Sequence, residues 1–129
     1  MSEPITLPVL LVEDDEPTRR MLKVVLDRAG FQSAFATNGR EAIDMLRANP
    51  YAVVVLDVMM PQVGGREVVE LIMAESLPVP VVICSAAGPR VLDQFDQEIV
   101  KAVIRKPFDV DTLIDAVKRA INPGPEPGG

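Results

Sequence analysis

The segment Val53-Val54-Val55-Leu56-Asp57 decides the fold class, because four apolar residues run together and end at an acid. A continuous apolar run is typical of a strand buried on both faces of a parallel sheet. Two further runs, Val9–Val12 and Val81–Cys84, are equally continuous, and shorter apolar runs lie at Gln32–Ala36 and Ala102–Ile104. Such runs also occur in buried helices, but their short length and their Val and Ile content favour five strands.

Stretches with the period of an amphipathic helix follow each predicted strand. They cover Pro17–Ala29, Gly39–Ala48, Gly65–Glu75, Pro89 to about Val100, and Asp109–Ile121. We expect Met21 and Leu22 on the buried side of the first helix, and Val110 and Ile121 within the apolar stripe of the last. The alternation of strand and helix predicts an α/β fold with an open parallel sheet, right-handed crossovers and helices on both faces.

Composition narrows the classes of protein that this chain can belong to. Its 129 residues fit one domain, which we expect at 1–122, followed by a flexible Pro/Gly tail at 123–129. One cysteine and no histidine exclude an internal disulfide, Cys/His zinc sites and histidine catalysis. The net charge of −6 argues against direct binding of nucleic acid. No membrane-length apolar run or targeting segment is visible, so we expect a cytoplasmic protein without membrane contact.

Polar residues with matching chemistry follow four of the predicted strands. Glu13 and Asp14 follow the first, Asp57 the third, Ser85 the fourth and Lys106 the fifth. In such sheets, sites form outside the carboxyl ends of the strands. Two carboxylates about 4 Å apart repel each other by about 1 kcal/mol in water and about 4 kcal/mol at an effective dielectric of 20. Such a cluster needs a cation to relieve it, and oxygen ligands favour Mg²⁺, Mn²⁺ or Ca²⁺.

Lys106 and Ser85 would complete a site for a phosphoryl group, as a positive charge and a hydroxyl donor. A carboxylate in that company can act as a nucleophile and form an aspartyl phosphate. Each residue alone also has an ordinary structural explanation: Asp57 as a helix cap, Ser85 as a turn serine and Lys106 as a surface lysine. Their joint occurrence at strand ends favours the site. We expect Arg19 and Arg20 to be helix-surface charges and Cys84 to be an inert core thiol.

Four motifs together resemble one known family. Leu10–Glu16, Val55–Gly65, Ile83–Ala87 and Lys106–Phe108 are similar, in this order, to the receiver domain of two-component response regulators. The similarity covers about Leu7 to Ile121. It implies a flavodoxin-like, doubly wound (βα)5 fold with a five-stranded parallel sheet in the order 2-1-3-4-5. It also implies phosphorelay signalling by a phosphoacceptor switch that assists its own phosphoryl transfer and hydrolysis, rather than by a conventional enzyme.

The resemblance implies a role for each site residue. Asp57 matches the phosphoacceptor, which receives its phosphoryl group from a sensor histidine kinase or a histidine phosphotransfer protein. Asp14, Asp57 and the backbone carbonyl of Met59 match the ligands of Mg²⁺ (or Mn²⁺), and Glu13 matches a contact to the metal through water.

In the same family, Ser85 matches the hydroxyl residue that moves toward the phosphoryl group, and Lys106 matches the lysine that pairs with it. The expected partner surface is formed by the fourth helix, fifth strand and fifth helix, in a monomer or a phosphorylation-dependent dimer. Three features depart from the family: Val103 replaces a frequent aromatic residue, 97–103 contains no glycine, and Gly64 replaces a frequent acid.

Two other classes of function compete with this interpretation. A receiver-like scaffold would bind proteins without being phosphorylated, and Val103 motivates that alternative. A phosphatase with an aspartyl-phosphate intermediate would carry a second Asp two residues after its nucleophile, whereas Met59 stands there. The glycine patterns of P-loop and Rossmann nucleotide sites follow none of the strands.

Overall fold

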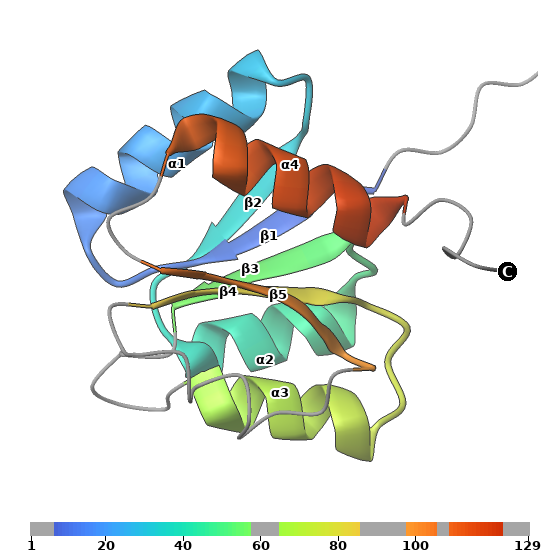
Figure 1. Ribbon diagram of the computed structural model, residues 1–129. Helices are drawn as coiled ribbons and strands as arrows, with labels where there is room; N and C mark the ends of the chain where they lie inside the picture. Colours follow the sequence, from blue (N-terminus) through green and yellow to red (C-terminus); the bar gives the residue numbers. More distant parts are fainter. Residues whose placement is uncertain (1–6, 58–64, 86–97, 106–108, 123–129) are drawn as a thin grey trace, which may run out of the picture.

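The structure is a computed structural model, which describes residues 7–57, 65–85, 98–105 and 109–122 (Figure 1). Within these ranges the chain forms five strands and four helices. The elements are β1 (Val9–Val12), α1 (Glu16–Arg28), β2 (Ser33–Ala36), α2 (Gly39–Ala48), β3 (Val53–Asp57), α3 (Gly65–Ala74), β4 (Val81–Ser85), β5 (Val100–Arg105) and α4 (Val110–Ile121).

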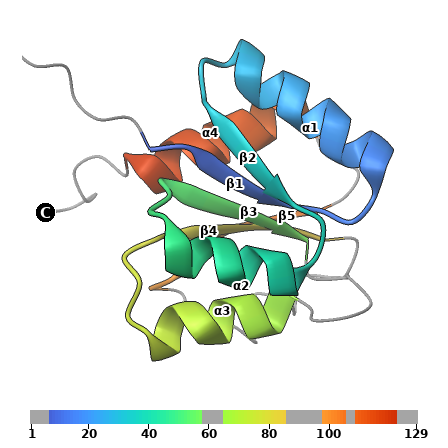
Figure 2. The ribbon, with the colours of Figure 1, turned by 180° about the vertical axis from the view of Figure 1, so that it is seen from behind.

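The five strands form one parallel sheet in the order β2-β1-β3-β4-β5. Helices α1 and α4 cover one face of the sheet, and α2 and α3 cover the other (Figures 1 and 2). The predicted doubly wound fold and its strand order are therefore confirmed. Strand β1 lies between β2 and β3, so the strand order reverses there, and ligands of open α/β sheets bind at such a reversal.

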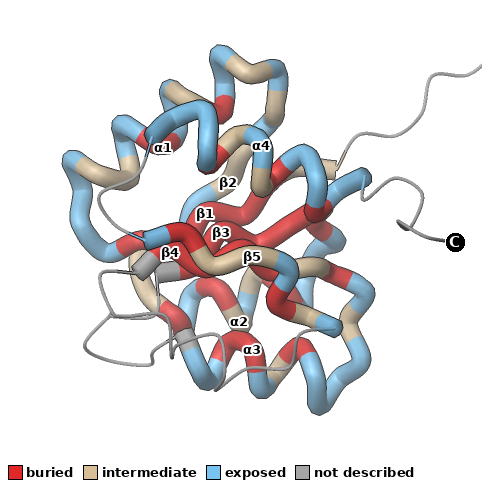
Figure 3. The backbone as a smooth tube through the Cα atoms, viewed as in Figure 1, coloured by how far each residue is buried: buried red, intermediate tan, exposed pale blue. Residues whose placement is uncertain are grey.

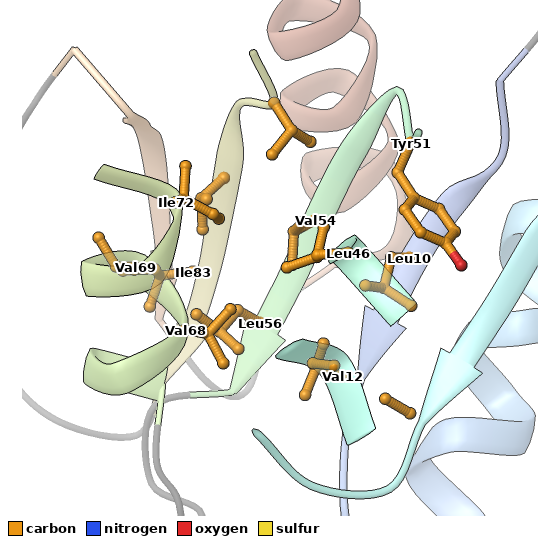
Figure 4. Close-up of a cluster of buried hydrophobic side chains, with 14 of the residues drawn as sticks. Leu10, Val12, Leu46, Tyr51, Val54, Leu56, Val68, Val69, Ile72 and Ile83 are labelled. Carbon is orange, nitrogen blue, oxygen red and sulfur yellow. The ribbon is translucent and has the colours of Figure 1, made fainter. Parts of the chain in front are cut away.

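The alternating side chains of the central strands explain why their sequences are continuously apolar. In β3, Val54 and Leu56 belong to the core layer under α2 and α3, whereas Val53 and Val55 belong to the layer under α1 and α4. All four are at most 2% exposed. Figure 4 shows the first layer, and the tube in Figure 3 is buried along β1, β3 and β4. Burial of each such side chain contributes about 1.5–3 kcal/mol to stability.

Cys84 lies in the second layer at 3% exposure, as predicted for a core thiol. Three side chains differ from the predicted helix faces. Met21 is 50% exposed, and Val110 and Ile121, the first and last residues of α4, are 49% and 38% exposed. At a helix end the core contact is lost within one turn. In α1, Leu22 and Leu26 carry the packing instead of Met21.

The helix predicted from Pro89 to about Val100 lies outside the described residues except at its end, where the prediction is wrong. Glu98 and Ile99 form a turn, and Val100 is the first residue of β5. Val100 pairs with Val81 and is 2% exposed. Val100 joins the sheet because pairing with β4 and burial in the core stabilise it more than a further helical turn would.

Strand β5 contains one extra residue relative to β4. Val81 pairs with Val100, but the next residue of β4, Val82, pairs with Ala102. Lys101 is the additional residue, and it is exposed. This β-bulge lets Val100 and Ala102 belong to opposite core layers although they are two residues apart.

None of the helices in the described ranges has both the length and the apolar character that a membrane crossing requires.

Candidate functional site

The carboxyl ends of β1 and β3 lie side by side where the strand order reverses. Val12, the last residue of β1, pairs with Leu56 of β3. The next residues along the two chains are Glu13 and Asp57, so the register places these two acids at the same level of the sheet. Asp14 follows one residue further on. The backbone thus brings together the three acids that the sequence predicts at this edge.

The ends of β4 and β5 continue the same edge. Asp57 pairs with Cys84, and the next residue of β4, Ser85, pairs with Arg105 at the end of β5. Lys106 follows Arg105 directly in the chain. Ser85 therefore lies one residue further along β4 than Cys84, the residue that pairs with Asp57.

The two acids after β1 have different environments. Glu13 is only 2% exposed, whereas Asp14 is exposed to solvent. A carboxylate oxygen of Glu13 lies 3.4 Å from the backbone nitrogen of Asp15. A buried carboxylate remains ionised only with charge or hydrogen-bond partners, while an exposed one is free to bind an ion from solution. The carboxylate of Asp14 is therefore accessible from solvent, whereas that of Glu13 is not.

The loop after β1 is fixed by hydrogen bonds on both sides. The Glu13 backbone nitrogen donates to the Ala36 carbonyl of β2 at 3.1 Å. The Asp15 carboxylate caps α1, accepting from the Thr18 backbone nitrogen at 3.1 Å and from the Thr18 hydroxyl. A cap of this kind contributes about 1 kcal/mol and sets where the helix begins. The acids are therefore held by the strand on one side and by the helix cap on the other.

The loop after β2 reaches the same edge and is fixed in a similar way. The Asn38 side chain accepts from the Glu41 backbone nitrogen at 2.9 Å and so caps α2. Glu41 in turn accepts from the Thr37 backbone nitrogen at 2.6 Å and from its hydroxyl. These hydrogen bonds, led by the one from the hydroxyl, lower the pKa of Glu41 below its usual value.

Several predicted site residues lie outside the described part of the structure. Met59 and Lys106 are among them, and so are the side chains of Asp57 and Ser85. Their roles stay predictions. Among the described side chains there is no group of three acids, cysteines or histidines that could hold a metal. The side chain of Asp57 lies outside the described residues, and the predicted donor set of Glu13, Asp14 and Asp57 is all oxygen, as Mg²⁺ prefers.

Of the three departures noted in the sequence, Val103 lies within the described residues, and so do residues 98–103 of the glycine-free segment 97–103. The Val103 side chain is partly buried and packs against the core layer under α2 and α3. Gly64 and Gln97 lie outside those ranges.

The sequence profile of the response regulator receiver domain matches residues 9–118. The chain belongs to this family. Receiver domains are parts of two-component systems, and the predicted family is therefore confirmed.

Curated relatives of this receiver include the transcriptional regulatory protein SrrA of Staphylococcus aureus. The two are 30% identical over 112 residues, which is 85% of this chain and 46% of SrrA. The receiver thus spans about half the length of the curated relatives that it matches.

Solved structures agree with this assignment. The receiver domain of a Francisella response regulator has a TM-score of 0.84 at 26% identity, covering 92% of this chain and 98% of that one. The Vibrio cholerae chemotaxis protein CheY4 has a TM-score of 0.79 at 26% identity, with coverage of 90% and 99%. The response regulator TrrA of Thermotoga maritima, solved in complex with Mg²⁺-BeF, has a TM-score of 0.80 at 27% identity, with coverage of 89% and 99%.

One residue beside the acids of this receiver was not predicted from the sequence. Arg19 is expected to be a surface charge like Arg20, but its guanidinium nitrogen Nη1 donates to the Glu13 carbonyl at 3.2 Å. Arg20 does behave as predicted and pairs with Glu16 on the surface of α1. The helical period cannot separate the two arginines, because the contact of Arg19 depends on the path of the loop before the helix.

Proposed function

We propose that this receiver accepts a phosphoryl group on Asp57 from a histidine of a sensor kinase or phosphotransfer protein, with Mg²⁺. The strand register carries the proposal, since it brings the backbone of Asp57 level with Glu13 and next to the strand that ends at Ser85. The related TrrA was solved in complex with Mg²⁺-BeF, which supports a magnesium-dependent site in this chain.

Asp14, Asp57 and the Met59 carbonyl would hold the metal, and Glu13 would contact it through water. The bound ion would neutralise the carboxylates and the incoming phosphoryl oxygens. The exposure of Asp14 leaves its carboxylate open to solvent, from which the ion enters. The carboxyl group of Glu13 is buried beside it, at 2% exposure.

In the transfer step, a carboxylate oxygen of Asp57 attacks phosphorus. The bond between phosphorus and the donor's histidine nitrogen breaks as the aspartyl phosphate forms. Lys106 pairs with one phosphoryl oxygen, and the Ser85 hydroxyl donates to another. The donor keeps the nitrogen electron pair, so the reaction needs no oxidant or reductant.

The phosphorylated receiver would change its binding of a protein target. We propose that the helix predicted from Pro89, β5 and α4 (the fifth predicted helix) form the target surface, in a monomer or a dimer that depends on phosphorylation. Residues 1–122 would form the receiver and 123–129 a flexible tail. Phosphorylation would act as a switch because the two states differ in charge and hydrogen bonding at one sheet edge.

Intact mass after incubation with acetyl phosphate tests the proposal. We expect one added phosphoryl group on the wild type with Mg²⁺, and none with EDTA or in Asp57→Asn. Asp44→Asn is a matched control, because it removes an exposed acid from the surface of α2 and should leave the adduct unchanged.

Small donors leave some receivers unmodified, so beryllofluoride binding provides the second measurement. A wild type that neither gains a phosphoryl group nor binds beryllofluoride with Mg²⁺ would be a binding scaffold, and the proposal would be wrong. An adduct that persists in Asp57→Asn would place the acceptor elsewhere.

A further inference from the structure

Two adjacent arginines on α1 have different surroundings. Arg20 is largely exposed and pairs with Glu16 within the same helix. Arg19 is partly buried, and its contacts lie in other elements. Exposed ion pairs within one helix contribute only tenths of a kcal/mol to stability. The contacts of Arg19 with other parts of the chain are therefore the ones to examine.

The guanidinium of Arg19 bridges the ends of β1 and β2. Its Nη1 donates to the Glu13 carbonyl at 3.2 Å, and its Cζ lies 4.9 Å from the centre of the Phe35 ring. That distance is within the range of a cation–π contact. Phe35 is 48% exposed on the edge strand, so the ring supports the guanidinium from the outer side of the sheet.

The positive charge of Arg19 also reaches the start of α2. It contributes to lowering the pKa of Glu41, after the hydrogen bonds from Thr37. Glu41 lies in the first turn of α2 and accepts hydrogen bonds from Thr37 in the loop after β2. Arg19 therefore contacts the loop after β1, and its charge acts on the first turn of α2.

We propose that Arg19 is a positioning residue that fixes the Glu13 peptide and thereby the direction in which Asp14 presents its carboxylate. The Glu13 nitrogen is already held by Ala36, so the contact to the Glu13 carbonyl fixes the second side of the same residue. Asp14 is the next residue, and it has the exposed carboxylate of the acid pair. The metal part of this inference rests on the proposed function.

If Arg19 acted only through its charge, its removal would change the metal affinity in the opposite direction to the loss of a positioning contact. Arg19 adds a positive charge close to the acids, so removing only that charge would tighten the binding of a divalent cation. Removing a positioning contact would weaken it, because outer contacts orient the groups that bind a metal. The sign of the change therefore separates the two roles.

The test compares Arg19→Met, Arg19→Lys and the matched control Arg20→Met. Methionine keeps an apolar stem without charge or donors, while lysine keeps the charge but lacks the planar guanidinium. Two quantities are measured on folded protein: hydrogen exchange of the backbone amides of residues 13–15 without metal, and the Kd for Mn²⁺ from the signal of the free ion in electron paramagnetic resonance.

We expect Arg19→Met to speed amide exchange at residues 13–15 and to raise the Kd for Mn²⁺ about tenfold, the lower end of outer-contact effects. For Arg19→Lys, the exchange rate and the Kd should both lie between those of the wild type and Arg19→Met. Arg20→Met should match the wild type in amide exchange. If Arg19→Met is too unstable to measure, Phe35→Leu, which removes the supporting ring, should give a smaller change of the same sign.

Unchanged amide exchange in Arg19→Met would overturn the positioning role whatever the metal does. Faster exchange with an unchanged or lower Kd would overturn its link to the metal. A wild type that binds no Mn²⁺ would overturn the proposed function instead, and the amide exchange would still decide whether Arg19 positions the loop.

Discussion

The two ends of the parallel strands carry different side chains. At the carboxyl ends the chain places Glu13, Asp14, Asp57 and Ser85. At the amino ends it places mainly apolar side chains around two adjoining hollows of about 320 and 450 Å³. Both hollows are lined by Leu7, Tyr51 and Pro78.

The proposed site thus lies at the carboxyl ends of the strands, and packing that stabilises the fold lies at their amino ends. Arg47 is the one charged side chain among the described residues that line the hollows, and it pairs with Glu75 at 2.8 Å, joining α2 to the turn after α3. The amino ends thus contribute packing, whereas the carboxyl ends gather groups whose mutual repulsion costs stability. We expect changes at the amino ends to alter stability without altering phosphorylation.

Tyr51→Ala should produce the largest effect on stability. Tyr51 is 8% exposed and belongs to the core layer in Figure 4. Truncating a buried aromatic side chain costs about 3 kcal/mol. Urea unfolding should show that loss, while phosphoryl incorporation per folded molecule stays at the wild-type level.

Tyr51→Phe provides the control, because it keeps the ring and removes only the hydroxyl. It should cost about 1 kcal/mol or less. A clear loss of phosphoryl incorporation in Tyr51→Ala at full folding would show that the two ends are coupled, contrary to the comparison.

Asn38→Ala should have an intermediate effect, at the carboxyl edge. The Asn38 side chain caps α2, and loss of such a cap costs about 1 kcal/mol. The exposed neighbour Arg40 in the first turn of the same helix offers a control, since Arg40→Ala removes no cap. Thermal unfolding should separate the two variants; equal stability would mean that the cap contributes nothing.

The smallest effect concerns the alkaline titration of Tyr51, the only tyrosine in a chain without tryptophan. Burial raises its pKa above the usual value, against a smaller opposing effect of the hydrogen bond from Asn49. The corresponding stability is fully present below the unfolded pKa of about 10 and is lost as pH rises through the folded pKa.

Tyrosinate absorbance should therefore rise at higher pH in the native protein than in urea, and Tyr51→Phe should show no such rise. Coincident titration curves in the folded and unfolded states would show that the amino end is open to water at Tyr51.

The sequence predicts the sheet well because its strands are buried on both faces, which leaves continuous apolar runs. It also predicts which strand ends carry acids, and the register places the backbones of Glu13 and Asp57 at the same level of the sheet. Features that depend on tertiary packing were harder to predict. Met21 has the period of a buried residue but is exposed, because Leu22 and Leu26 already fill the contact of α1.

Arg19 shows the same limit at the site. Its contacts to Glu13 and Phe35 join residues from three elements, and no local pattern encodes such a contact. The end of the helix predicted up to Val100 failed for a related reason, since pairing with Val81 determines where β5 begins.

The bulge in β5 has a consequence for length variation in this strand. Lys101 faces no residue of β4, and pairing is regular on both sides of it. Deleting any later residue of the strand would shift those beyond it to the wrong face, because side chains alternate. Deleting Lys101 alone would leave every pair from Ala102 onward in place. Strand β5 therefore has one position at which the chain can be shortened while Arg105 stays opposite Ser85.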